Sequence, residues 1–480
     1  MKKTIFTIAC ILSLNIFNSC SEDIIDLKPP YEEIIEDAIK SEEDVNKFLM
    51  GTYLKISSTS LYGSNFFFYG DLLGDTFFRS NKNFGGYTSL IMMNYDPINT
   101  GDINFYRSAY DVIQNANFVI NNELTDSQLN KQYKAEARFL RAITYFNLLN
   151  YYAASPKSGL NQDIGVPIAV YPYNPDEKIA RSSISDVYKL IVEDLNYAIE
   201  NAKAETTSKI YITKTAAKLM LSRVYLTRQQ NGDAQLAYNL TDDIINNSPS
   251  SFKLFTSTTK DAFKNYFSSS EDIVAENQPE TIWELDMNVL NNPGVNSSLS
   301  VFYSRTGSKR GLLAKQTFYD SFGTSDVRRD LFSFTSIPVE DNPKGVWMAK
   351  HERAAQPGGN YTRNNKILRF SEAYLNRVEA LYQLGKNTEA LTNLNEFASL
   401  RNGSAYSGGN LLNDILSERN KEFFGEGQRF LDLKRYNLPI NKGTNCPGNC
   451  DVPAGSKYFV FPFSEGQLII NPLAVQHPLW

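Results

Sequence analysis

Residues 418–435 read ERNKEFFGEGQRFLDLKR, a stretch in which acidic and basic residues alternate at close intervals. The acidic members are Glu418, Glu422, Glu426 and Asp432, and the basic members are Arg419, Lys421, Arg429, Lys434 and Arg435. Many of these opposite charges are three or four residues apart, a spacing that favours ion pairs along a helix. A glycosidase would instead need two carboxyl groups about 5–10 Å apart in an open cleft. The interleaved charges favour an internal network in which Arg429 and Asp432 fix the last helices.

Two helical pairs precede this stretch in the sequence. The nearer pair is predicted over 369–384 and 388–400, and the farther pair over 213–228 and 234–245. Small residues occupy the expected crossing points of the paired helices: Ala216, Ala217, Ala237, Ala380, Gly385 and Ala390. Small side chains let antiparallel helices approach closely, and the arrangement resembles tetratricopeptide repeats, whose period is about 34 residues.

Further helices are expected nearer the N-terminus. Candidates cover residues 41–56 and 103–121, and Thr125 to Gln128 fits a capping box that opens a long helix through Phe146. Ser183 caps another helix. Its inner side carries Val187, Leu190, Ile191, Leu195 and Ile199.

Residues 250–365 differ, because they are rich in Ser, Asn, Gly and Pro and lack long helical periodicity. Thr281 to Leu285 reads as a strand, and Trp283 and Trp347 are interpreted as packed residues. We therefore predict a mostly α fold, with tetratricopeptide-like helical pairs forming a curved scaffold over about 41–249 and 366–440. A large insertion of irregular loops and short strands interrupts it over about 250–365.

The N-terminus has the features of an export signal. Lys2 and Lys3 precede a mostly apolar stretch, Ile5 to Phe17, which is too short to span a membrane, since a span needs about 20 apolar residues. That stretch runs into Ser19 and Cys20, which looks like a lipobox. We expect residues 1–19 to be a lipoprotein signal peptide. Cys20 is then the site of lipidation, with palmitate or a similar acyl chain, and anchors the protein to a membrane. Residues 20–480 are expected to form a single domain.

Composition excludes several classes of function. The formal net charge is −5 and no basic run appears, so a nucleic-acid partner has no electrostatic support. The sequence has only two histidines, which leaves too few for a His-based triad or a multi-His metal centre, and neither a metal nor a cofactor is expected. Cys446 and Cys450 enclose a tight Pro-Gly-Asn turn, and we predict a small disulfide loop between them.

Several blocks of the sequence are similar to the SusD/RagB family. They are 135–142 (AEARFLRA) with 145–148, 369–375 with 379–380, 418–435, 461–463 with 471–472, and 476–480 in the place of the family's usual C-terminal block. The blocks keep the family order from the lipobox to the last residue. The resemblance therefore covers essentially the whole chain.

The resemblance implies a surface lipoprotein of the outer membrane that binds nutrient oligosaccharides. Such proteins pass their ligand to a SusC-like, TonB-dependent outer-membrane barrel and are not enzymes. Acidic residues directly after Cys20 resemble the sorting signal that sends Bacteroidetes lipoproteins to the cell surface. The alternatives are a RagB-like protein that captures peptides, a surface glycoside hydrolase, and an adhesin without a concave binding site.

Ligand-binding residues are expected on exposed loops, because aromatic rings cover the C–H face of a sugar while polar side chains bond its hydroxyl groups. Two segments have this mixed character, Phe77 to Tyr87 and Asn288 to Lys309. The residues predicted to contact a ligand are Arg79, Asn81, Asn83, Phe84, Tyr87, Tyr303 and Arg305. Phe66 to Tyr69 are assigned to the core, because three consecutive exposed Phe residues would promote aggregation. Asp71, Asp75 and Asp96 are possible calcium ligands, although their spacing matches no known cation loop.

Overall fold

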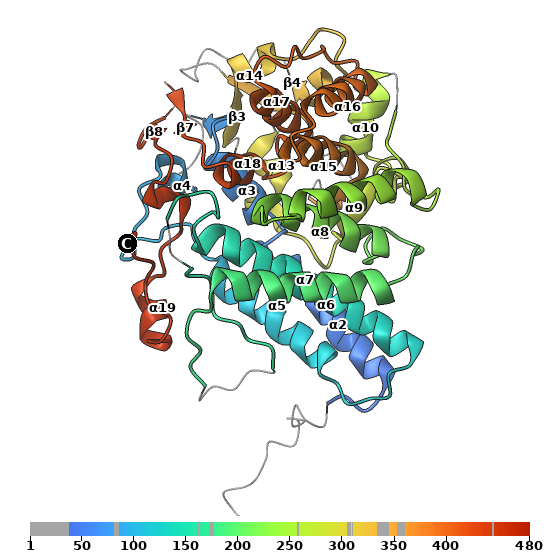
Figure 1. Ribbon diagram of the computed structural model, residues 1–480, viewed down its shortest axis with the longest axis vertical. Helices are drawn as coiled ribbons and strands as arrows, with labels where there is room; N and C mark the ends of the chain where they lie inside the picture. The colour runs from blue at the N-terminus through green and yellow to red at the C-terminus, as the bar shows by residue number, and fades with distance from the viewer. Residues whose placement is uncertain are drawn as a thin grey trace, which may run out of the picture.

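The computed structural model describes residues 38–80, 86–160, 163–171, 177–256, 259–304, 309, 311–333, 345–352, 361–443 and 446–480. Helices dominate it, with little sheet, which confirms the predicted fold class (Figure 1). The long helices of the first half are α2 (Glu42–Ile56), α5 (Phe105–Ile120), α6 (Gln128–Tyr152), α7 (Ile184–Asn201), α8 (Lys214–Arg228) and α9 (Asp233–Asn247). Those of the second half are α15 (Phe370–Gln383), α16 (Asn387–Leu400), α17 (Leu411–Phe423) and α18 (Arg429–Arg435).

These helices pack as neighbours in sequence order, α5 on α6, α6 on α7 and α8 on α9. Helix α15 packs against both α9 and α16. Ser41, Ser183 and Thr213 each accept a backbone N–H and so cap α2, α7 and α8. The cap of α6 is Ser127, which accepts from the Asn130 amide, so the prediction that Thr125 caps this helix was wrong. The Thr125 carbonyl instead accepts from Ser127 N and from the Asn130 side chain in the turn before the helix.

The small residues at the helix crossings are completely buried, as close packing requires: Ala216, Ala217, Ala237, Ala380 and Ala390. Gly385 turns the chain between α15 and α16 with φ +74°, a left-handed conformation that glycine adopts without strain. An added Cβ there would meet nothing within 4 Å, so the turn needs glycine for its backbone and not for space.

The insertion contains short elements. They are α10 (Lys260–Ser268), α11 (Asp272–Ala275), β2 (Thr281–Leu285), α12 (Gly294–Ser297), α13 (Leu299–Tyr303), β3 (Leu312–Lys315), α14 (Gln316–Asp320), the 3-10 helix Val327–Leu331, β4 (Phe332–Ser333), β5 (Gly345–Met348) and β6 (Asn365–Arg369). β2 pairs with β6, and a second sheet has the order β1-β3-β5-β4, where β1 is Phe77–Arg79. Trp283 and Trp347 lie buried in β2 and β5, which confirms their assignment to the packed interior.

The main hydrophobic core extends along the described chain from Val45 to Ala474, and Phe78, Leu313 and Trp347 form a smaller buried cluster. Phe66 to Tyr69 lie in the main core on α3 (Asn65–Leu72), as predicted. α3 also contacts the loop before α18 so closely that a Cβ on Gly70 would lie 1.7 Å from the Gly427 carbonyl oxygen. The glycines of the 418–435 stretch therefore have a packing role.

The C-terminal part returns to the core through short elements. They are β7 (Ile440–Asn441), β8 (Asp451–Val452), the 3-10 helix Lys457–Phe459 and α19 (Glu465–Ile470). Trp480 packs against Tyr95 in a tilted arrangement and against Tyr458 edge to face, and its indole N–H donates to Val460 O at 2.9 Å, so the last residue anchors the tail.

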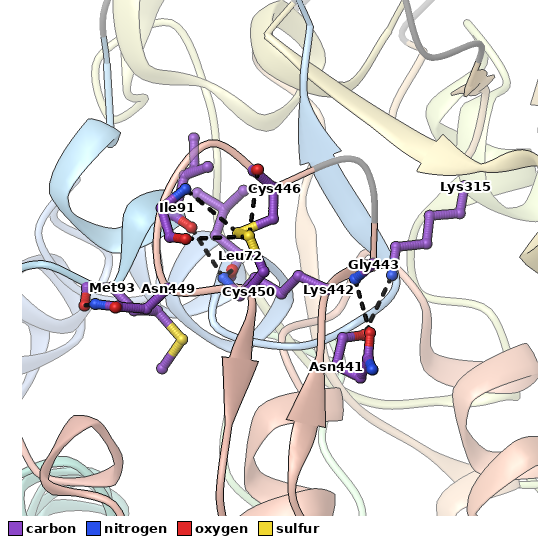
Figure 2. The surroundings of a disulfide bond; sticks show 11 residues. Leu72, Ile91, Met93, Lys315, Asn441, Lys442, Gly443, Cys446, Asn449 and Cys450 are labelled. Atoms are coloured by element: carbon purple, nitrogen blue, oxygen red, sulfur yellow. Dashed lines mark hydrogen bonds between the residues drawn. A yellow bond between two sulfur atoms is a disulfide. The ribbon is translucent and has the colours of Figure 1, made fainter.

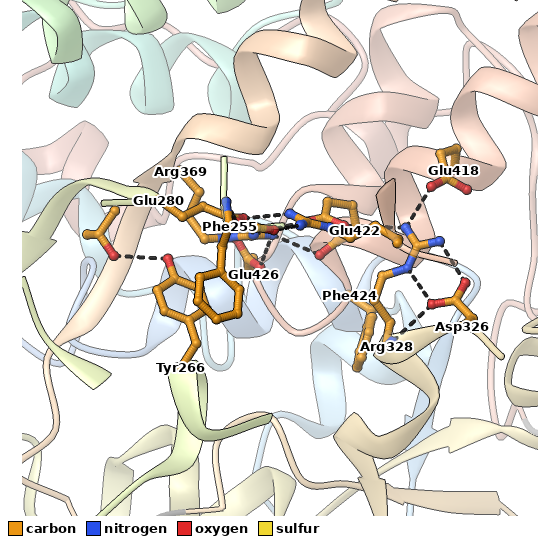
Figure 3. A network of polar contacts seen from close by, with 12 residues as sticks. Phe255, Tyr266, Glu280, Asp326, Arg328, Arg369, Glu418, Glu422, Phe424 and Glu426 are labelled. Carbon is orange, nitrogen blue, oxygen red and sulfur yellow. Dashed lines mark hydrogen bonds and ion pairs between the residues drawn. The ribbon is translucent and has the colours of Figure 1, made fainter. Parts of the chain in front are cut away.

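The charges of the 418–435 stretch belong to an internal network, as predicted, but the partners of Glu418 and Glu422 are arginines from outside the stretch and not neighbours three or four residues away (Figure 3). Arg369 contacts Glu280 at 2.7 Å and Glu422 at 2.8 Å, and Arg401 contacts the same two carboxylates at 2.7 and 3.0 Å. Arg328 extends the network to Glu418 at 2.7 Å and to Asp326 at 2.8 Å. All of these side chains are buried.

Arg429 belongs to a half-buried ion pair and Asp432 to buried ones, and only the pair of Asp432 with Arg435 runs along α18 itself. Arg429 binds Asp75, at 2.7 Å, in the loop between α3 and β1. Asp432 instead accepts from Arg419 at 3.1 Å and from Arg435 at 2.5 Å. The two residues therefore tie α18 to different parts of the molecule.

Candidate functional site

The two predicted ligand-binding segments meet at one surface. β1 pairs antiparallel with β3, with Phe77 opposite Ala314 and Arg79 opposite Leu312. Beyond the strand end, Ser80 N donates to Gly311 O at 2.9 Å, and Gly311 N donates to Phe302 O at 2.9 Å. Residues more than 200 positions apart in the sequence thus lie side by side. We call this place, formed by β1, α4 (Thr88–Met92) and α13, the β1–α13 surface.

Arg79 and Tyr87 are half-buried at this surface. The Arg79 guanidinium donates to the Thr88 hydroxyl at 3.1 Å, which ties the end of β1 to the start of α4. The Tyr87 ring packs on Phe302 and Phe68, with centroids 5.3 and 4.9 Å apart. Both predicted residues therefore remain candidates for ligand contact.

The orientation of Tyr87 is set by polar contacts as well. Its hydroxyl donates to the Asn65 side-chain oxygen at 2.8 Å, and its backbone is left-handed, with φ 57°. Burial raises the pKa of Tyr87 well above that of a free tyrosine. The phenol therefore stays neutral, and its ring is held rigidly at the surface.

Tyr303 does not lie on an exposed loop, contrary to the prediction. It is in α13, completely buried, with its ring against Phe68 and Phe77. Its hydroxyl donates to Asp71 Oδ2 at 2.5 Å. Residues 299–303 form a helical turn packed against β3, and this packing turns Tyr303 inward. Tyr303 therefore supports the surface from below and has no path to a ligand.

The remaining predicted contacts, Asn81, Asn83, Phe84 and Arg305, lie outside the described residues, as does Cys20. Their roles stay predictions. The described ends of both segments, Ser80 with Gly86 and Ser304 with Lys309, flank the β1–α13 surface.

A disulfide joins Cys446 and Cys450, whose Cα atoms are 5.4 Å apart (Figure 2). The loop that it closes rests on α4, because Asn449 N donates to Met92 O at 2.9 Å. Lys442 reaches under the same region and donates to Leu72 O at 2.6 Å and Ile91 O at 3.1 Å. The disulfide loop therefore supports the helix that follows Tyr87.

The aspartates considered for calcium have separate partners. Asp71 binds Tyr303 and Gly427 N, Asp75 binds Arg429, and Asp96 accepts from Ile98 N and Asn99 N at 2.9 and 2.7 Å. Burial alone would raise the pKa of Asp75, but Arg429 lowers it below its ordinary value. Within the described part of the chain, no group of three or more His, Cys, Asp or Glu residues is arranged to hold a metal ion.

Sequence reasoning missed a cavity of about 400 Å³ at another place in the fold. Residues of α2, of the first turns of α6 and of the segment between α7 and α8 line it, among them Tyr133, Glu136 and Tyr211. Spacing along α6 places Tyr133 and Glu136 on one face, a signal visible in the sequence. The third wall comes from residues about 70 positions later, and no local pattern predicts that they meet.

In the part of the chain that the structure describes, no helix has the length and apolar character needed to cross a membrane. Paired helices carrying an inserted, loop-rich surface define a helical scaffold of the tetratricopeptide type. Two family models match the chain, one described as "Starch-binding associating with outer membrane" over residues 23–226 and the SusD family over 299–467. The chain belongs to the SusD/RagB family.

Relatives of similar length support this assignment. SusD-like protein P38 of Formosa agariphila is 24% identical over 92% of both chains. A SusD-like protein of Bacteroides ovatus is 25% identical over 90% of this chain and 82% of its own.

Solved structures have the same fold. A SusD superfamily protein of Bacteroides thetaiotaomicron superposes with a TM-score of 0.80 at 25% identity, over 91% of this chain and all (100%) of its own. A putative sugar binding protein of Bacteroides vulgatus gives 0.79 at 23% identity, over 92% and 99% of the two chains.

Proposed function

We propose that the protein binds nutrient oligosaccharides at the β1–α13 surface and delivers them to a SusC-like, TonB-dependent barrel in the outer membrane. The observation that carries this proposal is the meeting of two segments rich in aromatic and polar residues at one rigidly supported surface. The name of the Bacteroides vulgatus neighbour, a putative sugar binding protein, agrees with a carbohydrate ligand.

The proposal includes the absence of catalysis. The carboxylates that a glycosidase reading would use, Glu418, Glu422 and Glu426, are buried and engaged by arginines or by Lys350. Burial alone would raise the pKa of Glu422, but Arg401, Arg369 and Arg328 hold it well below its ordinary value. A general acid must instead carry a proton at working pH. This arrangement supports a binding protein.

Anchoring at the cell surface through Cys20 is also part of the proposal, with residues 1–19 removed and residues 20–480 forming a single domain. Cells grown with labelled palmitate should incorporate label into the wild-type protein and not into the Cys20→Ala variant. Proteolysis of intact cells then tests the outward orientation. Label in the Cys20→Ala protein would contradict lipidation at this residue.

Isothermal titration of the chain from Ser21 against oligosaccharides and short peptides tests the ligand. We expect saturable binding to one type of glycan, weakened at least about tenfold by Arg79→Ala or Phe84→Ala, since a hydrogen bond to a charged group or a stacked ring contributes this much. Arg107→Ala, on the exposed side of α5, is the matched control for charge and size. Binding of peptides alone would favour the RagB-like alternative, and product formation would contradict the non-enzymatic role.

A further inference from the structure

The cavity beside α2 and α6 has the size and position of a ligand pocket of its own. Its volume of about 400 Å³ falls within the range of about 300–1,000 Å³ typical of small-molecule sites. Its walls share no residue with the β1–α13 surface. Figure 1 shows α2 low in the molecule, and α4 and α13 above it.

The cavity wall combines apolar and polar groups. Leu49 and Met50 of α2 form an apolar side, and the half-buried Tyr133 and Tyr211 add aromatic rings to the lining. Hydroxyl and amide groups of Asn46, Gln132, Thr206 and Thr207 complete the lining. Flat rings next to both donors and acceptors match a sugar, which has a C–H face and a rim of hydroxyl groups.

Of the three charged residues that line the cavity, Lys203 and Glu205 are exposed and Glu136 is the buried one. Its side chain is 2% exposed and, in the described part of the chain, makes no ion pair. Tyr53 donates to one carboxyl oxygen at 2.6 Å and Gln132 to the other at 3.0 Å. The Tyr53 hydroxyl in turn accepts from Ile212 N at 3.0 Å, which fixes its orientation.

This carboxyl group keeps capacity for a ligand. An ionised carboxylate accepts about four hydrogen bonds, and neutral protein donors supply two of them. Burial raises the pKa of Glu136, although both donors and Lys203 act in the opposite direction. Hydroxyl donors from a ligand would compensate the desolvation of the charged form.

We propose that this cavity is a second binding site, for a neutral sugar of one or two rings. Glu136 accepts hydrogen bonds from two sugar hydroxyl groups while Tyr133 and Tyr211 cover the apolar face of the ring. Lys203 and Glu205, the exposed charged residues of the lining, carry opposite charges that offset each other. The hydroxyl groups of a neutral polyol can accept hydrogen bonds from Lys203 and donate hydrogen bonds to Glu205.

Methionine methyl groups report on the two sites separately. Met50 lines the cavity, whereas Met92 ends α4 beside the β1–α13 surface. The chain from Ser21, labelled with ¹³C-methyl methionine, is titrated into the millimolar range with glucose, galactose, maltose and cellobiose. For at least one sugar, the Met50 signal should shift saturably without a matching change at Met92.

Two variants test the assignment. Glu136→Gln should weaken the Met50 response at least about tenfold, because a hydrogen bond to a charged group is lost. Thr207→Trp, at an exposed position, should abolish the response by filling the cavity without disturbing the core. Glu193→Gln is the matched control, since this glutamate is exposed on α7 and outside the lining.

Each contrary result overturns the second site. No Met50 shift with any sugar, or a shift that persists in both cavity variants, would contradict it. A response to methylammonium and to none of the sugars would make the cavity a cation site instead. A response at Met92 alone would support the proposed function and overturn this inference, so the two proposals fail separately.

Discussion

Glu422 and Glu136 are both buried glutamates, and their surroundings differ. Glu422 lies among Arg369, Arg401 and Arg328, which outweigh its burial and hold its pKa well below the ordinary value. Glu136 faces a cavity with neutral donors, and burial raises its pKa. A buried charge that is completely neutralised inside the protein serves the fold, whereas one left with neutral partners beside a cavity is available to a ligand.

The network around Glu422 also explains why the 418–435 stretch is so dense in charge. Arg369 lies at the junction of β6 and α15, Glu280 precedes β2, and Arg328 belongs to the 3-10 helix of the insertion. The ion pairs therefore connect the insertion to the helical scaffold. Within the described residues, Glu418 and Glu422 are buried and paired with arginines, so their position gives the catalytic interpretation no support.

The largest effect is expected when the network loses its central acid. Glu422→Ala leaves buried guanidinium groups short of a partner and should lower the free energy of unfolding by about 3–5 kcal/mol. Urea denaturation of the chain from Ser21 measures it. Glu43→Ala removes an exposed partner of Lys47 and should leave the midpoint nearly unchanged. Equal losses in both variants would mean that the network contributes no more than a surface pair.

A pH-dependent effect should come from Asp71. Burial raises its pKa from 3.8 to about 7, with Tyr303, Gly427 N and Lys350 opposing the shift and Glu426 adding to it. The native state therefore binds more protons than the unfolded state between these values, and this contribution to stability falls as the pH rises through that window. The slope approaches about 1.4 kcal/mol per pH unit.

The Asp71→Asn variant cannot titrate and should lack this contribution. Urea denaturation from about pH 4 to about pH 8 gives the unfolding free energies of wild type and variant. Their difference isolates the contribution of Asp71 to the pH dependence from those of other groups. Above the folded pKa the difference should become constant. A difference independent of pH would contradict the raised pKa.

The Tyr303→Phe variant tests whether Tyr303 stabilises the β1–α13 surface from below or contacts the ligand directly. Loss of the hydroxyl leaves buried Asp71 without one donor and should cost about 1–3 kcal/mol of stability. Glycan affinity, measured by isothermal titration, should change little, in contrast to Arg79→Ala. A large loss of affinity with unchanged stability would return Tyr303 to the ligand site.

The smallest effect is expected from the disulfide. Cys446 and Cys450 are four residues apart, and closing so short a loop stabilises by about 2 kcal/mol at most. Cys446→Ser with Cys450→Ser should lower the unfolding free energy by no more than this and increase hydrogen exchange around Met92. Alkylation and mass spectrometry of the unreduced wild type check the bond itself, and two alkylated thiols would contradict it.

The helices could be predicted because their signals are local. Ser183 and the apolar residues after it predicted α7, and Thr213 predicted the start of α8. The start of α6 was misjudged because Thr125 and Ser127 both offer a hydroxyl, and contacts of Asn130 decide between them.

The candidate site was predicted only in part. Its two segments were identified from aromatic and polar composition, but pairing of β1 with β3 is what joins them. Tyr303 was predicted to be a surface residue, because composition does not reveal that the rings of Phe302 and Tyr303 are buried. The cavity at Glu136 was not predicted from the sequence, since its walls come from three separate parts of the chain.

By itself, the sequence determined the helices, most of their caps and the dense charge of residues 418–435, because these depend on side chains a few positions apart. Only the tertiary structure decided that Arg429 pairs with Asp75, that Tyr303 is buried and that Glu136 faces a cavity. Each of these depends on residues distant in the chain, whose contacts and desolvation are established only when the elements pack together.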